Sequence, residues 1–438
     1  MGLDFHSPKT TRYLQVYDYY KDLIVHGKLE EGTKMPSIRR CCEQLGLSKT
    51  TIETAYLCLA ADGYIIARPQ SGYYVTGRAA KNQAKKAAKR QEEQKQKILY
   101  DFTSNNADED SFDFDLWRRY IKSALRQDKR MLTYGESQGE YELRETICNY
   151  VINKRNAVCT PEQIVIGAGS QSLLNMLCPI IKDKQKVCFH DTPFAQGIVI
   201  FEDYGFEIVE NFENADILYM TPSNMTSLGD VMSVEKRLEI LKESASHNRL
   251  IIEDDYNNEF RYFTKPRPCL QGLAGGEHVV YLSTFSKLLL PSIRLSFMIL
   301  PYDLLPLYQK KKALYNQTAS KVEQLALCQF LRDGHLDAQI RKLKRLYSNK
   351  TKQLCYELEQ AFGKNASIST GESVSMVHVK LKSNLSNQEF CKKALQYGIK
   401  LIPSYIEEKE YAQIALSTCE VPSHKFSEAV SLLKQIKE

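Results

Sequence analysis

The sequence predicts a multidomain protein: a small helical unit with a β-hairpin, a short basic segment and a large α/β domain. Three observations lead to this fold class. The chain has 438 residues, more than one ordinary domain needs. Hydrophobic spacing is helical in the first eighty residues and changes to alternating strands and helices after residue 100. Residues 1 to 100 hold 17 Lys and Arg against 10 Asp and Glu, whereas residues 101 to 438 hold 42 against 43. A basic front part on a near-neutral body is typical of a nucleic-acid-binding module joined to a second domain.

Composition describes a soluble globular protein, with 43% hydrophobic and 26% charged residues. No segment approaches the roughly 18 consecutive apolar residues of a membrane helix. The start MGLDFHSPKTTR lacks the apolar region of a secretory signal, so we expect a cytoplasmic protein. The 12 cysteines are scattered and form no C-x-x-C pair, which favours reduced, buried thiols over a disulfide scaffold or a metal site.

Three helices are expected in residues 11 to 63. The first carries apolar or aromatic residues at helical spacing and ends at Gly27. The second follows the cap residue Ser37 and ends at Gly46, and the third follows Ser48 and ends near Gly63. Their expected inward positions are Tyr13, Val16, Tyr17, Tyr20, Leu23 and Ile24, then Ile38, Cys41, Cys42 and Leu45, then Ile52, Ala55 and Leu59.

Two short strands, 64 to 68 and 73 to 76, flank a turn at 69 to 72 and predict a β-hairpin. Three helices and a hairpin together make a winged helix-turn-helix. The second helix of the helix-turn-helix can enter the major groove of DNA, and the hairpin lies against the backbone or the minor groove. The alternative is a helical accessory domain with a solvated polar face.

The stretch GKLEEGTKMPSIRRCCEQLGLSKTTIETAYLCLAADGYIIARPQSGYYV resembles the DNA-binding domain of GntR-type bacterial regulators over its whole length. The resemblance implies a DNA-binding domain over residues 1 to 77. Matched by position, it implies DNA contacts from Arg39, Ser48, Lys49, Thr50 and Thr51, with Gly72 at the tip of the wing.

Residues 78 to 100 are expected to be a basic linker. The segment RAAKNQAKKAAKRQEEQKQK holds eight basic and two acidic residues without an apolar stripe. It cannot bury enough surface to fold alone, although its composition favours partial helix.

Strand-length apolar runs recur from residue 101 onward, and amphipathic stretches separate several of them. This pattern predicts a mostly parallel α/β sheet, in which ligands bind outside the carboxyl ends of the strands. The expected strands are 186 to 190, 216 to 220, 249 to 253, 278 to 282 and 295 to 300.

Polar residues at these strand ends supply four chemical groups that an aldehyde cofactor with a pyridine ring and a phosphate requires. Lys287 offers an amine for a Schiff base, Asp254 a carboxylate for the pyridinium nitrogen, and Phe194 a flat group against the ring. A glycine turn that starts a helix after residue 167 is a common phosphate site. The phosphate set is Ser170, Gln171, Thr284, Ser286 and Arg294. Taken singly, each has an ordinary alternative as a surface charge, a helix cap or a core residue.

Residues 101 to 438 resemble a fold-type I aminotransferase, with a large subdomain at about 135 to 315 and a small one at about 320 to 438. Its fusion behind a GntR-type winged helix is the layout of MocR-type transcriptional regulators. The segment STFSKLLLPSIRLSF matches the family's motif with the pyridoxal 5′-phosphate (PLP) lysine, here Lys287, and the phosphate arginine, here Arg294. IIEDDYNNEFRY implies that Asp254 pairs with the pyridine nitrogen and that Tyr256 lies near the phenolic oxygen. YGESQG implies that Tyr134 enters the neighbouring subunit's phosphate site, and hence a homodimer.

The sequence also departs from the family pattern. Residues 226 to 229 replace the usual Pro-Thr-Gly segment, and Phe194 replaces a more common tyrosine. Ala415 stands where aminotransferases and several amino-acid-sensing relatives place an arginine for the substrate carboxylate, and a methyl group cannot bind a carboxylate.

Three functions therefore compete. The first is a PLP-binding transcriptional regulator whose effector is PLP itself or a small amino compound, and which controls vitamin B6 or amino-compound metabolism. The second is a transaminase-like enzyme with an accessory DNA-binding domain. The third is a DNA-binding protein whose aminotransferase-like domain is only a dimer scaffold. The missing arginine argues against an efficient transaminase and gives Lys287 a sensing role rather than turnover.

Overall fold

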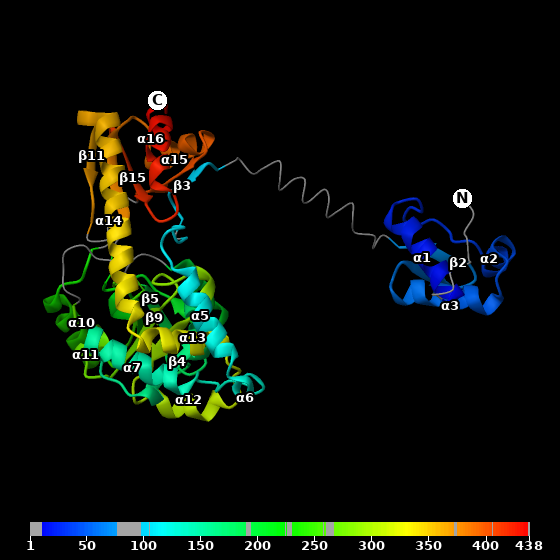
Figure 1. The fold of residues 1–438 in the computed structure, drawn as a ribbon, viewed down its shortest axis with the longest axis horizontal. Helices are drawn as coiled ribbons and strands as arrows, with labels where there is room; N and C mark the ends of the chain where they lie inside the picture. The colour runs from blue at the N-terminus through cyan, green and yellow to red at the C-terminus, as the bar shows by residue number, and fades with distance from the viewer. Residues whose placement is uncertain are drawn as a thin grey trace. The chain divides into compact units, whose positions relative to one another are not determined.

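The computed structural model describes residues 11–76 and 98–436, except 105, 190–193, 224, 226–229, 257, 260–266, 372–374 and 405. The chain divides into two compact units, Met1–Gln96 and Lys97–Glu438 (Figure 1). Residues 78–97, most of the expected linker, lie outside the described residues, as do residues 226 to 229. No helix within the described part of the chain is long and apolar enough to cross a membrane.

The first unit is the expected winged helix-turn-helix. Ser37 and Ser48 cap the second and third helices by accepting hydrogen bonds from the backbone N–H groups of Arg40 and Thr51, and Gly46 ends the second helix with φ +64°. The hairpin strands pair antiparallel. The elements are α1 (Arg12–Val25), α2 (Ile38–Leu45), α3 (Lys49–Ala61), β1 (Ile65–Arg68) and β2 (Gly72–Val75).

The core of this unit combines apolar and tyrosine side chains from all three helices and the hairpin. Val16, Ile52 and Leu59 are fully buried. Tyr56 is also fully buried, and its hydroxyl donates to the carbonyl of Pro36 at 3.0 Å. The third helix is thus fixed by its inner face, while its first turn stays exposed.

A seven-stranded sheet forms the centre of the second unit, in the order β4-β10-β9-β8-β7-β5-β6. β10 is antiparallel to both its neighbours, and the other strands are parallel to one another. Each expected strand is present within two residues of its predicted ends. The strands are β4 (Ile164–Gly167), β5 (Lys186–Phe189), β6 (Glu207–Ile208), β7 (Ile217–Met220), β8 (Leu250–Asp254), β9 (Val279–Thr284) and β10 (Ser296–Ile299).

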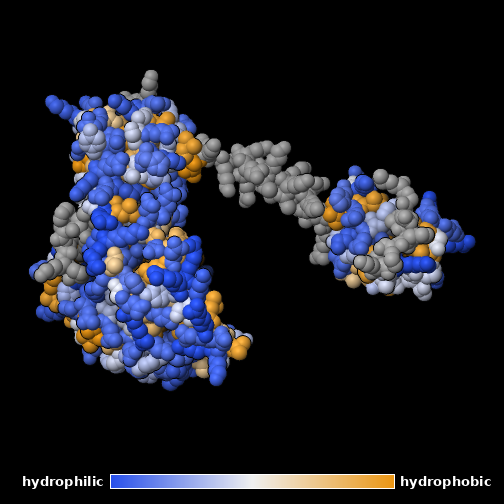
Figure 2. Space-filling model, viewed as in Figure 1, coloured by the Kyte–Doolittle hydropathy of each residue, from blue (hydrophilic) through white to orange (hydrophobic). Residues whose placement is uncertain are grey.

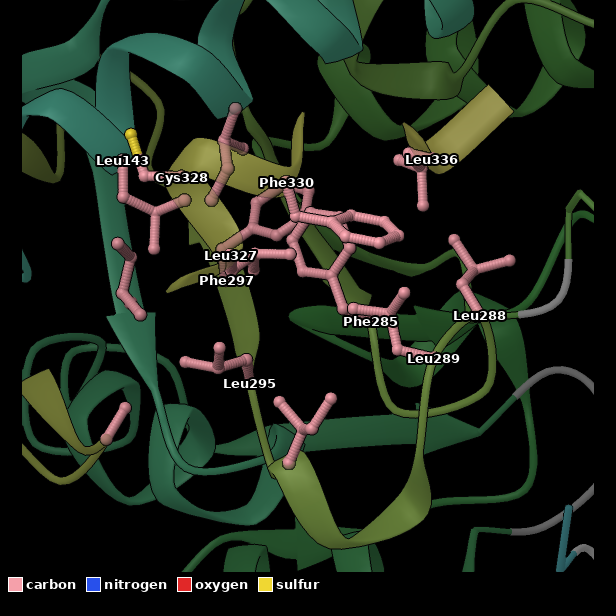
Figure 3. Packing of buried hydrophobic residues seen from close by; sticks show 14 of the residues in the cluster. Leu143, Phe285, Leu288, Leu289, Leu295, Phe297, Leu327, Cys328, Phe330 and Leu336 are labelled. Atoms are coloured by element: carbon pink, nitrogen blue, oxygen red, sulfur yellow. The ribbon is translucent and has the colours of Figure 1, made fainter. Parts of the chain in front are cut away.

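Helices cover both faces of this sheet, and alternate residues of each strand point to opposite faces. One core packs strand residues against α5, α7 and α13, and Figure 3 shows Phe285, Phe297 and Phe330 converging within it. The core on the other face involves α8, α9 and α12. The bounds are α5 (Phe114–Leu125), α6 (Asp128–Met131), α7 (Tyr141–Arg155), α8 (Ser170–Leu177), α9 (Ala195–Asp203), α10 (Val234–Ser246), α11 (Leu270–Leu273), α12 (Leu305–Lys312) and α13 (Lys321–Arg332).

A smaller four-stranded sheet, in the order β11-β12-β15-β14, has its own core with the C-terminal helices. The long helix α14 joins the two cores: Leu343 packs in the large one and Leu354 in the small one. Since α13 packs with α5 and α7, the cores separate within α14, later than the boundary expected near residue 320. The elements are β3 (Tyr100–Asp101), α14 (His335–Phe362), β11 (Ala366–Ser369), β12 (Met376–Lys382), α15 (Asn387–Gln396), β13 (Ile399–Lys400), β14 (Ile402–Pro403), β15 (Tyr411–Ser417) and α16 (Phe426–Lys434).

The visible surface of each unit is mostly hydrophilic, and smaller hydrophobic patches are scattered over it (Figure 2). The carboxyl ends of β7, β8 and β9 bring Thr221, Asp254 and Thr284 to one edge of the large sheet, where they line a cavity.

Candidate functional sites

The cavity at this edge has a volume of about 450 Å³ and collects side chains from segments that are far apart in the sequence. Of the residues expected to hold a cofactor, it brings together Ser170, Phe194, Asp254, Tyr256, Thr284, Ser286, Lys287 and Arg294. Gly169, Gln196, Thr221, Leu282, Ser283, Pro291 and Ser296 complete the lining.

Asp254 supplies the carboxylate of the cavity from the end of β8. Burial raises its pKa to about 6, while a hydrogen bond from Tyr219 and the charge of Lys287 act in the opposite direction. The Tyr219 hydroxyl donates to Asp254 Oδ2 at 2.6 Å. The cavity thus contains a carboxylate whose ionisation depends on its polar neighbours.

Lys287 supplies the amine, three residues beyond the end of β9. Burial lowers the pKa of Lys287, and interactions with Cys419 and Asp254 offset part of this effect. Its Nζ lies 4.8 Å from the ring centroid of Tyr256. A lysine with a lowered pKa is more often neutral, which is the form that reacts with a carbonyl carbon.

The third part of the cavity is suited to an anion. Gly169, with φ +94°, leads into α8, whose first N–H groups have no partner within the helix. A Cβ at Gly169 would collide with the guanidinium of Arg294, so this glycine allows the arginine to lie against the start of the helix. Ser286 Oγ is buried and has no hydrogen-bond partner in the described structure. An anion there would gain backbone, hydroxyl and guanidinium donors together.

The threonine beside this region is part of the local framework. Thr284 Oγ1 accepts hydrogen bonds from the backbone N–H of Ser286 at 3.2 Å and from Ser296 Oγ at 2.8 Å. Thr284 therefore holds the turn that carries Ser286 as well as lining the cavity.

Phe194 lies at the start of α9 on the wall of the cavity. A Cβ at Gly197 would collide with the Phe194 ring, so the glycine permits their close approach. The Phe194 ring centroid lies 6.0 Å from that of Tyr219, with an angle of 31° between the ring planes.

Two expected residues do not line this cavity. Gln171, in the first turn of α8, is exposed. Tyr134 is completely exposed. Ala415 is buried on β15, opposite His378 of β12 and Ile402 of β14, so the position of the expected carboxylate clamp lies inside a paired sheet.

The hydrogen bond from Tyr219 to Asp254 is the main contact at the cavity that the sequence did not reveal. Tyr219 lies in the strand next to that of Asp254, opposite Ile252 in the register, so it reaches Asp254 along the diagonal. A tyrosine within the otherwise apolar run 217 to 220 was the available signal, because a buried tyrosine hydroxyl normally has a hydrogen-bond partner.

The helix-turn-helix presents a second group of candidate residues. Arg39 and Lys49 are exposed, and form ion pairs within their own helices, with Glu43 at 3.3 Å and Glu53 at 3.5 Å. Such exposed pairs contribute little stability and exchange readily for a phosphate partner. The other expected contacts are also at the start of α3: Thr50 is exposed, Thr51 is partly buried, and Ser48 is the helix cap.

Two cations lie beside Tyr74 of the hairpin: Arg68 of β1, and Lys34 from the segment before α2, which bridges to Tyr74. Neither was predicted from the sequence. The Arg68 guanidinium lies 4.5 Å from the ring centroid of Tyr74, and Lys34 Nζ lies 5.8 Å from the same centroid. Ser71 and the Tyr74 hydroxyl share a hydrogen bond of 2.6 Å. Gly72, exposed with φ +102°, begins β2 and pairs with Arg68, next to the turn at the tip of the wing. An aromatic ring thus holds a positive charge at the wing.

Comparison with known protein families matches both units. Residues 12–75 match the family "Bacterial regulatory proteins, gntR family", and residues 97–424 match "Aminotransferase class I and II". Proteins with the second domain normally bind PLP.

Whole-chain relatives have the same layout. The chain is 33% identical to the uncharacterized HTH-type transcriptional regulator YdeL of Bacillus subtilis, covering 96% of both chains. It is 24% identical to the HTH-type pyridoxine biosynthesis transcriptional regulator PdxR of Corynebacterium glutamicum, covering 80% of this chain and 79% of PdxR. An archaeal alanine:glyoxylate aminotransferase shares the fold, with a TM-score of 0.67 and 20% identity over 82% of this chain and 95% of that one. The chain therefore belongs to the MocR-type transcriptional regulators, DNA-binding proteins in which a GntR-type helix-turn-helix domain is fused to an aminotransferase-like domain.

Proposed function

We propose that the second unit binds PLP in the cavity around Lys287, and that this binding, or the reaction of bound PLP with a small amino compound, controls DNA binding by the first unit. The observation that carries the proposal is the presence of an amine, a buried carboxylate and an anion-binding corner in one cavity. The unpartnered Ser286 Oγ fits the group in particular, because a phosphate oxygen would satisfy it.

Each side chain has a distinct task in this proposal. When bound, PLP supplies an aldehyde that reacts with amines and a ring that withdraws electrons. Lys287 would hold the aldehyde end, and Asp254 would pair with the ring nitrogen. Arg294, Ser286, Thr284 and the start of α8 with Ser170 would bind the phosphate, while Phe194 and Tyr256 would contact the ring and its phenolic oxygen. Gln171, exposed in the first turn of α8, would contribute only through its backbone N–H.

The DNA-contacting residues are proposed on the exposed surface of the helix-turn-helix. Arg39 and Lys49 would contact phosphates and set affinity, and Thr50 and Thr51 would contribute to base reading. Ser48, the N-cap of α3, would fix the start of this helix at the DNA. Gly72 would allow the wing to approach the DNA backbone. A regulator that binds chromosomal DNA works in the compartment that holds it, which in a bacterium is the cytoplasm.

The effector is proposed to be PLP or an amino compound that does not use the usual carboxylate clamp. Ala415 offers no charge for a carboxylate. The likeness to a pyridoxine biosynthesis regulator supports PLP itself, and with it a role in vitamin B6 metabolism. Either ligand can change DNA binding only if its affinity differs between two states of the protein.

A homodimer is part of the proposal because Tyr134 is completely exposed and outside its own cavity. In this arrangement Tyr134 would enter the phosphate site of the neighbouring subunit. Two helix-turn-helix units in one particle would also read two half-sites of an operator.

The test is a DNA-binding titration at fixed salt with a fragment from upstream of the protein's own gene, with and without PLP. Salt must be fixed because phosphate contacts make affinity fall steeply with ionic strength. We expect PLP to change the affinity in the wild type but not in Lys287→Ala, whose visible absorbance should be lost. A wild type that takes up no PLP would contradict cofactor binding, and unchanged DNA affinity with PLP and candidate amines would contradict sensing.

Lys49→Ala provides the complementary control, because Lys49 and the cavity belong to different units. We expect this substitution to weaken binding to all DNA sequences by a similar factor. The slope of log affinity against log salt concentration should fall by about one. PLP uptake should remain unchanged. Equal loss of both activities would contradict the separation of tasks between the units.

A further inference from the structure

Tyr219 connects two of the cavity residues proposed to contact the cofactor ring, Asp254 and Phe194. It is 2% exposed in the middle of the large sheet. Its hydroxyl donates to Asp254, and its ring stacks on Phe189 with centroids 4.9 Å apart and lies next to Phe194. One side chain therefore holds the carboxylate and supports the aromatic wall.

The hydrogen bond acts on the charged form of Asp254. A donor to a carboxylate oxygen stabilises the ionised group, and burial disfavours it. These opposing effects leave the pKa of Asp254 at about 6. Without the phenol, burial would be less opposed, and the pKa of Asp254 would rise. The group would then be neutral at pH values at which it is ionised in the wild type. A neutral acid cannot form an ion pair with a protonated ring nitrogen.

A second tyrosine on the other side of β8 provides a structural counterpart. Tyr281, on β9, donates to Asp255 Oδ2 at 2.7 Å and is also 2% exposed. Asp255 does not line the cavity, and it forms a buried ion pair with Arg155 at 2.7 Å. The two tyrosines therefore make similar buried hydrogen bonds to adjacent aspartates, but only one of these aspartates lines the cavity.

We propose that Tyr219 is a positioning residue that occupies one carboxylate oxygen of Asp254, keeps this group ionised, and so selects ligands whose heteroaromatic ring nitrogen carries a proton. This inference rests on the proposed binding of PLP. Tyr219 acts through Asp254 and does not itself react.

The test compares PLP affinity across pH, from about 5.5 to 8.5, in full-length wild type, Tyr219→Phe and Tyr281→Phe. A hydrogen bond to a charged group corresponds to about 10- to 100-fold in affinity. For Tyr219→Phe we expect about a tenfold loss at the acid end that becomes smaller as pH rises, because the pKa of Asp254 increases and its ionised fraction recovers only at higher pH. Tyr281→Phe should lower thermal stability and leave the shape of the pH profile unchanged.

Two further variants make the result specific. In an Asp254→Asn background, Tyr219→Phe should have no pH-dependent effect, because no carboxylate remains to titrate. Replacing Tyr219 with 3-fluorotyrosine keeps the shape and makes the phenol a stronger donor, so affinity should persist to lower pH than in wild type. This variant tests the idea even if Tyr219→Phe does not fold.

Several outcomes would overturn the inference. These are wild-type affinity in Tyr219→Phe at every pH, an equal loss at every pH, or no shift with 3-fluorotyrosine. Failure of the wild type to take up PLP at any pH would instead reject the proposed function itself, so the two failures are distinguishable.

Discussion

At the scale of single residues, the surroundings of two adjacent aspartates at the end of β8 shift their pKa values in opposite directions. Burial raises the pKa of Asp254 to about 6. Burial acts in the same direction on Asp255, but the Arg155 guanidinium and hydrogen bonds from Ser223 and Tyr281 hold the pKa of Asp255 below its ordinary value. Because neighbouring residues along an extended chain point to opposite faces, the chain places a carboxylate with a raised pKa beside the cavity and one with a lowered pKa behind it.

In the protein without PLP, Asp254 and Asp255 should therefore make the free energy of unfolding depend on pH in opposite directions. The folded-state pKa of Asp254 lies above its ordinary value of 3.8, so stability present at low pH is lost as pH rises through about 6. Asp254→Asn removes this loss and should stabilise the protein above pH 6 by up to about 3 kcal/mol relative to wild type. Urea unfolding at pH about 4 and about 7.5 measures the effect.

Asp255→Asn is the matched control with the opposite sign. Because the pKa of Asp255 is lowered, its contribution to stability is present above its ordinary pKa and is lost at lower pH. Removing the charge also leaves Arg155 buried without its ion-pair partner, which costs about 3–5 kcal/mol. A difference between Asp254→Asn and wild type that stayed constant with pH would contradict our account.

A residue could be assigned to the candidate site from the sequence only where its place depends on its neighbours along the chain. Lys287, Asp254 and Arg294 could be singled out because each lies at or near a strand end within a recognisable segment. Tyr219 and Arg155 could not, because their partners come from another strand or helix and depend on register and packing. The sequence could show that Ala415 cannot bind a carboxylate, but not that its strand neighbours are His378 and Ile402.

At the scale of elements, the caps Ser37 of α2 and Ser48 of α3 were predictable because capping is local, whereas the cap Ser233 is seen only in the structure. Ser37 caps α2 and Ser233 caps α10 with the same geometry: each side chain accepts a backbone hydrogen bond of 3.2 Å from the third residue after it. The two helices belong to different units. The reversed direction of β10 was not predictable from its own residues, since strand direction depends on distant partners.

These two caps predict that the same Ser→Ala substitution destabilises a different unit at each site. Ser37→Ala should destabilise the first unit by about 1 kcal/mol and weaken DNA binding, because α2 is part of the helix-turn-helix. Ser233→Ala should destabilise the second unit by a similar amount without altering DNA affinity in the absence of PLP. Calorimetry and limited proteolysis of the full chain measure the two effects. If both variants shifted the same unfolding transition equally, the units would not be independent in stability.

At the scale of the whole molecule, charge and hydrophobic spacing were sufficient to divide the chain, because a DNA-binding surface and an enzyme-derived fold have different compositions. The structure divides the chain into two compact units, Met1–Gln96 and Lys97–Glu438, and this boundary falls within the expected linker. Contacts that a residue makes with a second copy of the chain are not encoded in its local sequence. Tyr134 illustrates this, since the resemblance assigns it to a phosphate site and the structure leaves it fully exposed.

The proposed site shared between two subunits predicts complementation between two defective chains. Tyr134→Ala should weaken PLP binding, and Lys287→Ala should abolish the absorbance of bound PLP. In a mixed dimer, the Lys287→Ala chain still donates its Tyr134 to the site that contains Lys287, so that site has every proposed contact. Differently tagged chains purified as a heterodimer should therefore bind one PLP per dimer with wild-type affinity. If the heterodimer bound PLP as weakly as the Tyr134→Ala homodimer, Tyr134 would not act across the subunit boundary.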